Sequence, residues 1–219
     1  MKLHDLPTPA ALVDGTRLQH NIVRMQSRMS ALGVRLRPHM KTAKCLPVAE
    51  LQIVAGAQGV TVSTLKEAEV FFDAGISDIL YAVCISPLKL AQARALRERG
   101  CALTVVVDSL AAARAIAASR HAFEVMIEID TDGHRAGVEP DAELLIDIGR
   151  TLQAGGAVLK GVMTHAGASY ECRTEAALQA MAEQERSRCV RAALRLRAAG
   201  LPCLEVSVGS TPTALSAQQ

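Results

Sequence analysis

Residues able to do covalent or acid–base chemistry follow short apolar runs at four places along the chain. The first place is the run 37–42, Arg-Pro-His-Met-Lys-Thr, which comes directly after Val34–Leu36. Lys41 in this run carries a primary amine, the group that forms a Schiff base with a carbonyl cofactor. The amine is nucleophilic once it has lost its proton, which a nearby cation such as Arg37 would favour. Lys44 is the local competitor for the same role.

The second place is the segment 130–138, where two carboxylates, a histidine and an arginine follow an apolar run. Arg135 could hydrogen-bond a phenolate-type oxygen or a substrate carboxylate, because its guanidinium offers several donors in one plane. A metal site formed by Asp130, Asp132 and His134 is one alternative, since closely spaced carboxylates occur in such sites. A polar loop closed by internal ion pairs is the other.

The third and fourth places carry a histidine with a tyrosine, and a glycine with two hydroxyls. His165 comes directly after an apolar run and could stack on a cofactor ring or transfer a proton. Tyr170, close by, could reach a ring nitrogen or a phosphate. Gly209 would let the backbone approach a phosphate group, whose oxygens the hydroxyls of Ser210 and Thr211 could then satisfy.

The elements that must position these residues alternate between short apolar runs and helical stretches, which predicts parallel strands joined by helices. The expected strands are Val34–Leu36, Gly59–Val62, Asp78–Ala82, Ala102–Val107, Phe123–Ile129, Val158–Met163 and Cys203–Val208. The expected helices are Gly15–Leu32, Leu46–Ala55, Leu65–Ala74, Pro87–Arg99, Leu110–Ser119, Asp141–Gln153 and Glu175–Ala199. Near-constant spacing favours a (β/α)8 TIM-type barrel over a doubly wound sheet. No G-x-G-x-x-G motif follows the first expected strand, which argues against dinucleotide binding.

The expected barrel is one strand short. A closed barrel needs eight strands and about 250 residues, whereas this chain has 219 residues and stops soon after the seventh expected strand. We therefore expect a single α/β domain over residues 1–219, truncated after the seventh strand. Because the carboxyl ends of parallel strands lie on one face of a barrel, the four polar segments should meet in one pocket there.

Composition excludes several classes of function. Half of the residues are apolar and 21% are charged, as in an ordinary globular domain. A net charge of +2 with 2% aromatic residues argues against nucleic acid as a partner. No apolar run is long enough to span a membrane, and the N-terminus lacks the apolar core of a signal peptide, so we expect a cytoplasmic protein. The six scattered cysteines fit reduced thiols.

Taken together, these segments resemble the fold-type III pyridoxal-phosphate (PLP)-dependent enzymes, the family that includes alanine racemase. The D-serine dehydratase and D-threonine aldolase branch is the most similar. The resemblance extends over essentially the whole chain. It rests on the segments 6–14, 37–44, 128–138, 164–170 and 207–213, which occur in the family's order.

The resemblance implies a role for each candidate residue. Lys41 would hold PLP covalently and act as the base at the substrate α-carbon. Arg135 would contact the phenolic oxygen of the cofactor, and His165 would lie near its pyridine ring. Tyr170 would pair with the ring nitrogen. The loop 209–211, with Ser210 and Thr211, would help to hold the phosphate.

The resemblance also implies an activity: a PLP-dependent lyase acting on D-3-hydroxy amino acids, by D-serine dehydration and deamination or by D-threonine retro-aldol cleavage. Members of the family continue into an eighth strand and a C-terminal β-domain, which carries the ligands of a divalent metal. We expect that part to be absent here, and we expect a homodimer in the full-length protein. The alternatives are a non-catalytic PLP-binding protein of cofactor homeostasis, an amino-acid racemase and an inactive fragment.

Overall fold

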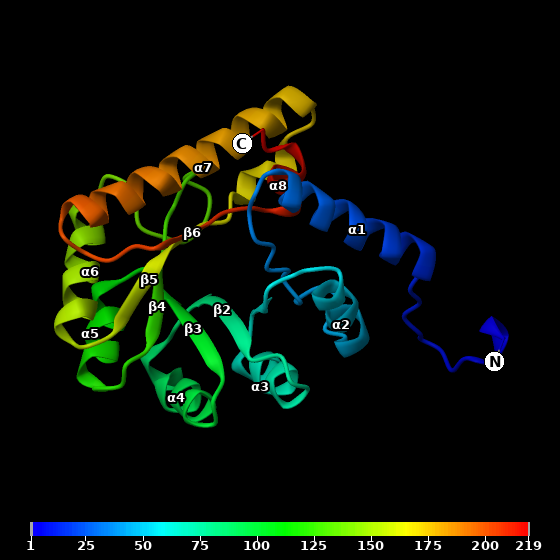
Figure 1. The fold of residues 1–219 in the computed structure, drawn as a ribbon, viewed down its shortest axis with the longest axis horizontal. Coiled ribbons are helices and arrows are strands. Elements are labelled where there is room, and N and C mark those ends of the chain that lie inside the picture. The colour runs from blue at the N-terminus through cyan, green and yellow to red at the C-terminus, as the bar shows by residue number, and fades with distance from the viewer. Residues whose placement is uncertain (1, 219) are drawn as a thin grey trace.

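In the computed structural model, which describes residues 2–218, a curved parallel sheet has helices along its outer side (Figure 1). The sheet order is β1-β2-β3-β4-β5-β6, so each strand pairs with the next one in the chain. The strands are β1 Val60–Val62, β2 Asp78–Cys84, β3 Ala102–Val107, β4 Glu124–Glu128, β5 Val158–Met163 and β6 Glu205–Ser207. This arrangement confirms the predicted α/β class and describes a six-stranded parallel half-barrel.

Eight α-helices and three short 3-10 helices join and flank the strands in the described part of the chain. The α-helices are α1 Gly15–Ala31, α2 Leu46–Val54, α3 Leu65–Asp73, α4 Leu90–Glu98, α5 Leu110–Ala118, α6 Glu143–Ala154, α7 Glu175–Ala198 and α8 Thr211–Ser216. The 3-10 helices are η1 Leu3–Asp5, η2 Pro87–Lys89 and η3 Gly167–Glu171. None of the described helices is long and apolar enough to cross a membrane.

The expectation of seven strands is wrong for the described residues, because Val34–Leu36 does not form one. Val34 is 50% exposed, so a strand at this place would bury little apolar surface. The backbone pairs with the β1 edge slightly later in the chain instead. The N–H of Gln58 donates to the carbonyl of Leu36 at 2.8 Å, and an isolated parallel bridge joins His39 to Thr61. The first polar segment thus lies beside β1 without forming a regular strand.

The two sides of the sheet bury different sets of side chains, because successive residues of a strand face opposite sides. The outer side packs against the helices in one large apolar cluster that includes Leu103, Val105 and Ile127. The inner side carries a small apolar cluster, formed by Leu80, Val106, Met126 and Met163. A small inner cluster inside a larger helix-covered one is the layering of a TIM-type barrel.

Side-chain caps fix where the helices begin. Thr64 and Ser109 accept hydrogen bonds from the backbone N–H groups three residues later, at 3.0 and 3.3 Å, and so confirm the predicted starts of α3 and α5. The sequence did not predict η3 or α8. These two short helices directly follow β5 and β6, where the polar segments with His165 and Ser210 lie.

Candidate active site

His165 lies where the polar segments meet at the carboxyl edge of the sheet. Its imidazole interacts with the charges of Lys41, Arg135 and Asp132 and with the backbone of Gly209. These neighbours come from the segment beside β1, the loop after β4 and the loop after β6. The structure therefore brings together the four segments that the sequence pointed to.

Lys41 is exposed, and its side chain makes no ion pair with any described residue. Its competitor Lys44 does, with its Nζ 3.1 Å from an oxygen of Glu67. Arg37, expected beside Lys41, instead pairs with Asp78 at the start of β2, at 2.5 and 2.9 Å. Lys41 is thus the lysine of this segment whose amine is available for chemistry.

His39 is a site residue that sequence reasoning missed. Burial, followed by the positive charge of Lys41, lowers the pKa of His39 to about 4. Its Nδ1 accepts the backbone N–H of Lys41 at 3.1 Å, and its Nε2 lies 3.3 Å from the hydroxyl of Ser63. A ring nitrogen that accepts an N–H carries no proton, so His39 is neutral and its Nε2–H donates to Ser63. The only signal in the sequence is a histidine two residues before the lysine.

The carboxylates of the loop after β4 organise the loop itself. Asp130 accepts the N–H groups of Asp132 and Gly133 at 3.2 and 2.7 Å. Asp132 accepts the N–H of Ala168 at 2.9 Å, which ties this loop to η3. The interpretation of a self-organised polar loop therefore holds, with backbone N–H groups in place of the expected internal ion pairs.

Arg135 extends from this loop across Gly167. A Cβ at Gly167 would lie 2.6 Å from Cδ of Arg135, so only glycine leaves room for the arginine in this position. Arg135 is exposed and forms no ion pair within residues 2–218. Together with Lys41 it supplies two unpaired positive charges beside His165.

The structure does not gather Asp130, Asp132 and His134 as a set of metal ligands. Within the described residues, the group that brings three ligand atoms within 4.8 Å of one another is Cys84, Asp108 and Glu128. Cys84 Sγ donates to Glu128 at 3.0 Å, and burial raises the pKa of both groups. A thiol must lose its proton to bind a metal. Because the thiol of Cys84 keeps its proton and donates it to Glu128, we interpret this group as a hydrogen-bonded pair rather than as a metal site.

His165 and Tyr170 lie close to each other after β5. Their ring centroids are 6.0 Å apart, and Tyr170 is 54% exposed. Burial, followed by the charges of Arg135 and Lys41, lowers the pKa of His165. The imidazole is therefore held in its neutral form, in which one ring nitrogen can accept a proton.

The two hydroxyl residues of the loop after β6, Ser210 and Thr211, differ in their exposure to solvent. Gly209 has φ +125°, a backbone conformation that favours glycine. Ser210 is buried, and its Oγ caps α8 by accepting the N–H of Thr213 at 3.2 Å. Thr211 is exposed. From the sequence we expected the hydroxyl of Ser210 to contact phosphate. In the structure it caps α8 and stabilises the loop instead.

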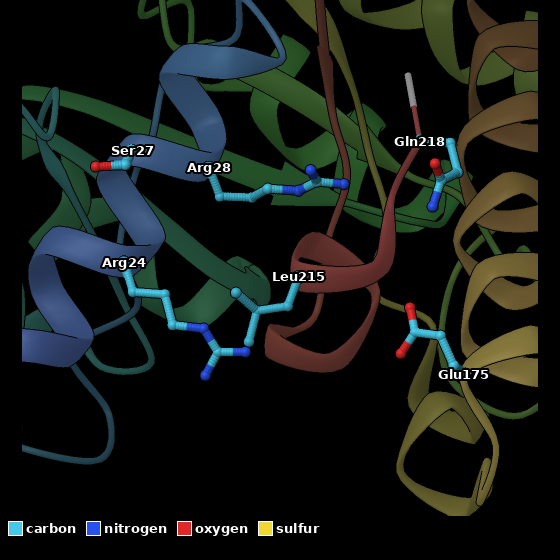
Figure 2. A pocket seen from close by; sticks show the side chains of 6 residues that line it. All are labelled: Arg24, Ser27, Arg28, Glu175, Leu215 and Gln218. Carbon is cyan, nitrogen blue, oxygen red and sulfur yellow. The ribbon is translucent and has the colours of Figure 1, made fainter.

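A cavity of about 560 Å³ opens between α1, α8 and the start of α7 (Figure 2). Arg28 of α1 hydrogen-bonds the carbonyl of Ala217 beside it. None of the predicted site residues lines this cavity, so the candidate site rests on the convergence around His165. The lining residues are Arg24, Ser27, Arg28, Glu175, Leu215 and Gln218.

Comparisons with known proteins identify the family of this chain. The family model described as alanine racemase, N-terminal domain, matches residues 13–219. D-threo-3-hydroxyaspartate dehydratase of Delftia sp. strain HT23 is 64% identical over 98% of this chain and 58% of its own length. Its solved structure matches with a TM-score of 0.96.

Two further relatives are more distant. D-serine dehydratase of Dictyostelium discoideum is 30% identical, over 96% of this chain and 57% of that protein. A crystal structure of D-threonine aldolase from Filomicrobium marinum matches with a TM-score of 0.86 at 30% identity, over 98% of this chain and 60% of that one. The chain thus spans somewhat more than half the length of these relatives.

Proposed function

This chain belongs to the alanine racemase N-terminal domain family, and we propose that it forms the barrel part of a PLP-dependent lyase acting on D-3-hydroxy amino acids. The proposal includes one PLP-binding domain over residues 1–219, whose complete fold is a (β/α)8 TIM-type barrel. The substrate is a small D-amino acid with a hydroxyl on its β-carbon.

One observation carries the proposal: at the carboxyl edge of the sheet, the charges of Lys41 and Arg135, neither in an ion pair with a described residue, act on His165 and lower its pKa. PLP carries a phosphate and a phenolate, so two positive charges beside an aromatic ring suit it. The 64% identity to a dehydratase of a D-3-hydroxy amino acid supports the same assignment.

The residues present fit this cofactor. Lys41 would be the point of covalent attachment, Arg135 would contact the phenolic oxygen, and His165 would lie beside the ring. Tyr170, exposed near His165, would reach the ring nitrogen. The loop of Gly209, Ser210 and Thr211 would hold the phosphate. A Cβ added at Gly209 would meet only the methyl of Ala214, at 3.7 Å, so the space in front of this loop is open.

Lys41 and His165 would have different roles in the proton transfers of the reaction. PLP, when bound, withdraws electrons from the substrate α-carbon and weakens its bonds. The amine of Lys41 would remove the α-proton, since no carboxylate of the described chain holds it as a cation. His165, kept neutral by burial and by the charges of Arg135 and Lys41, would accept a proton on its ring nitrogen.

We extend the proposal to the complete protein. It would be a cytoplasmic homodimer that also binds a divalent metal, which polarises the β-hydroxyl of the substrate as a Lewis acid. We place the ligands of that metal outside residues 1–219.

The test is a product assay on the complete protein with added PLP. Dehydration of D-threo-3-hydroxyaspartate or D-serine releases ammonia and a 2-oxo acid, whereas retro-aldol cleavage of D-threonine releases glycine and an aldehyde. We expect ammonia from the first two substrates. Tight PLP binding without either product would favour a cofactor-homeostasis protein, and interconversion of D- and L-alanine would favour a racemase.

A further inference from the structure

A carboxylate with no assigned role lies beneath the two loops that follow β5 and β6. Glu185 of α7 is 1% exposed, and its Oε1 accepts the backbone N–H of Ala166 at 2.7 Å. The side chain of Thr213 and the backbone of Gly209 also hydrogen-bond to it. Because a carboxylate oxygen accepts hydrogen bonds, the backbone of Gly209 contributes its N–H to this contact.

Three buried hydroxyls extend this contact across both loops. The Oγ atoms of Ser169 and Ser210 are 2.8 Å apart, and Ser210 Oγ lies 3.0 Å from Thr213 Oγ1. Thr213 Oγ1 also accepts the N–H of Ser210 at 2.8 Å. Each of the three residues is at most 5% exposed. The network therefore runs without interruption from η3, through the cap of α8, to Glu185.

Gly209 connects Glu185 to His165. Its N–H faces the carboxylate of Glu185, and its backbone also hydrogen-bonds the ring of His165. That second bond favours the protonated imidazole, so the ring donates and the carbonyl of Gly209 accepts. A displacement of Gly209 would therefore reach both the predicted phosphate loop and His165.

We propose that Glu185 is a positioning residue that fixes the loop 209–211 in the conformation needed to bind the cofactor phosphate. The inference rests on the proposed function, which places the phosphate of PLP at that loop. A buried carboxylate is stable only when its oxygens are hydrogen-bonded. In return, the groups that contact the carboxylate, from Ala166, Gly209 and Thr213, are held at fixed positions. Burial raises the pKa of Glu185 above its ordinary value, and the hydrogen-bond donors around the carboxyl oppose this rise.

The test compares PLP with pyridoxal, which lacks the phosphate. In the complete protein, Glu185→Gln keeps the shape of the side chain but turns one acceptor into a donor that faces N–H or O–H groups. Hydrogen bonds to a charged group are the strong ones, so the dissociation constant of PLP should rise about tenfold or more. The dissociation constant of pyridoxal should rise less than that of PLP, because pyridoxal uses the ring contact with His165 but not the phosphate loop.

Glu183→Gln is the matched control, because it makes the same chemical change two residues earlier on α7, at an exposed side chain paired with Arg186. It should leave the preference for PLP over pyridoxal unchanged. The same preference in Glu185→Gln as in the wild type would overturn the inference, while the proposed function would stand. Failure of the wild type to bind PLP would overturn both.

A variant that does not fold is replaced by a second one. If circular dichroism shows that Glu185→Gln is unfolded, Glu185→Asp keeps the charge but shortens the side chain, which draws the carboxylate away from its donors. Loss of the preference for PLP in Glu185→Asp supports the inference, and an unchanged preference in the folded variant overturns it.

Discussion

His39 and Lys41 interact through a hydrogen bond and through the charge of Lys41. The ring of His39 accepts the backbone N–H of Lys41, and the charge of Lys41 in turn disfavours protonation of the ring. Ser63 accepts from the other nitrogen. The loop that presents Lys41 is therefore built around a neutral histidine, and an acidic solution should disturb it.

Stability should fall as the pH drops through the window between the two pKa values of His39. Unfolded, the ring has its ordinary pKa of 6.5, and folded it has a pKa of about 4. Between these values the unfolded chain binds more protons, so the free energy of unfolding decreases with decreasing pH. His39→Asn keeps an acceptor for the N–H of Lys41 and removes the titrating ring.

The measurement is urea unfolding of wild type and His39→Asn at about pH 7 and about pH 5. The wild type should lose more stability than the variant between these two conditions. Equal losses would mean that the protonation of His39 is not linked to folding.

Gly167 should matter because Arg135 lies across it. In Gly167→Ala the new methyl would occupy the space of Cδ of Arg135, so the arginine must move. PLP should then bind several-fold more weakly, while the free energy of unfolding without PLP changes by less than about 1 kcal/mol. A double-mutant cycle with Arg135→Ala supplies the control. If Gly167→Ala weakens PLP binding as strongly in the Arg135→Ala background, the effect does not pass through the arginine.

At the scale of elements, β5 and β6 hold the loop of His165 next to the loop of Gly209. Their register pairs Gly161 with Glu205 and Met163 with Ser207. The two strands approach so closely that a Cβ at Gly161 would lie 1.9 Å from the carbonyl oxygen of Glu205. Only a glycine at this position allows the last pair of described strands to form.

Gly161→Ala should separate β6 from β5 and lower the free energy of unfolding by about 3 kcal/mol or more, as expected when backbone atoms must move. Gly15→Ala is the control, because a Cβ at Gly15 meets nothing within 4 Å. Thermal unfolding followed by circular dichroism measures both. A Gly161→Ala protein as stable as Gly15→Ala would contradict the close approach of the two strands.

The sequence predicted the six strands and the longer helices well, and it missed the short helices η3 and α8. The helices α3 and α5 begin where they were predicted to begin, because the caps formed by Thr64 and Ser109 are local interactions. The extended segment before Lys41 was shifted, since its pairing partner at Thr61 is distant in sequence. The short helix α8 has a local start signal, a capping box of Ser210 and Thr213 with Pro212 in its first turn, but this segment was interpreted as a phosphate loop instead.

The candidate site was predicted as a set of segments rather than as a set of contacts. Parallel strands bring their carboxyl ends to one edge, so Lys41, Arg135 and His165 could be grouped in advance. Which lysine is unpaired could not be predicted, because the ion pair of Lys44 with Glu67 forms only in the folded chain. The burial of Glu185 could not be predicted either, because it depends on the loops that fold over α7. The roles of the individual residues toward PLP stay predictions.

At the scale of the whole molecule, the parallel half-barrel gathers the candidate site residues at one edge of its sheet. The chain spans 58% of the length of the Delftia dehydratase and superposes on it with a TM-score of 0.96. The half-barrel brings Lys41, Arg135, His165 and the loop of Gly209 to the same edge. The central claim is that this edge binds PLP through Lys41.

The most direct test adds PLP to the complete protein, reduces it with borohydride and maps the modified peptides by mass spectrometry. The account predicts a pyridoxyl group on Lys41, lost in Lys41→Ala and retained in Lys44→Ala. Modification of Lys44 instead, or spread over many surface lysines of the folded protein, would contradict the assignment of Lys41 as the residue that binds the cofactor.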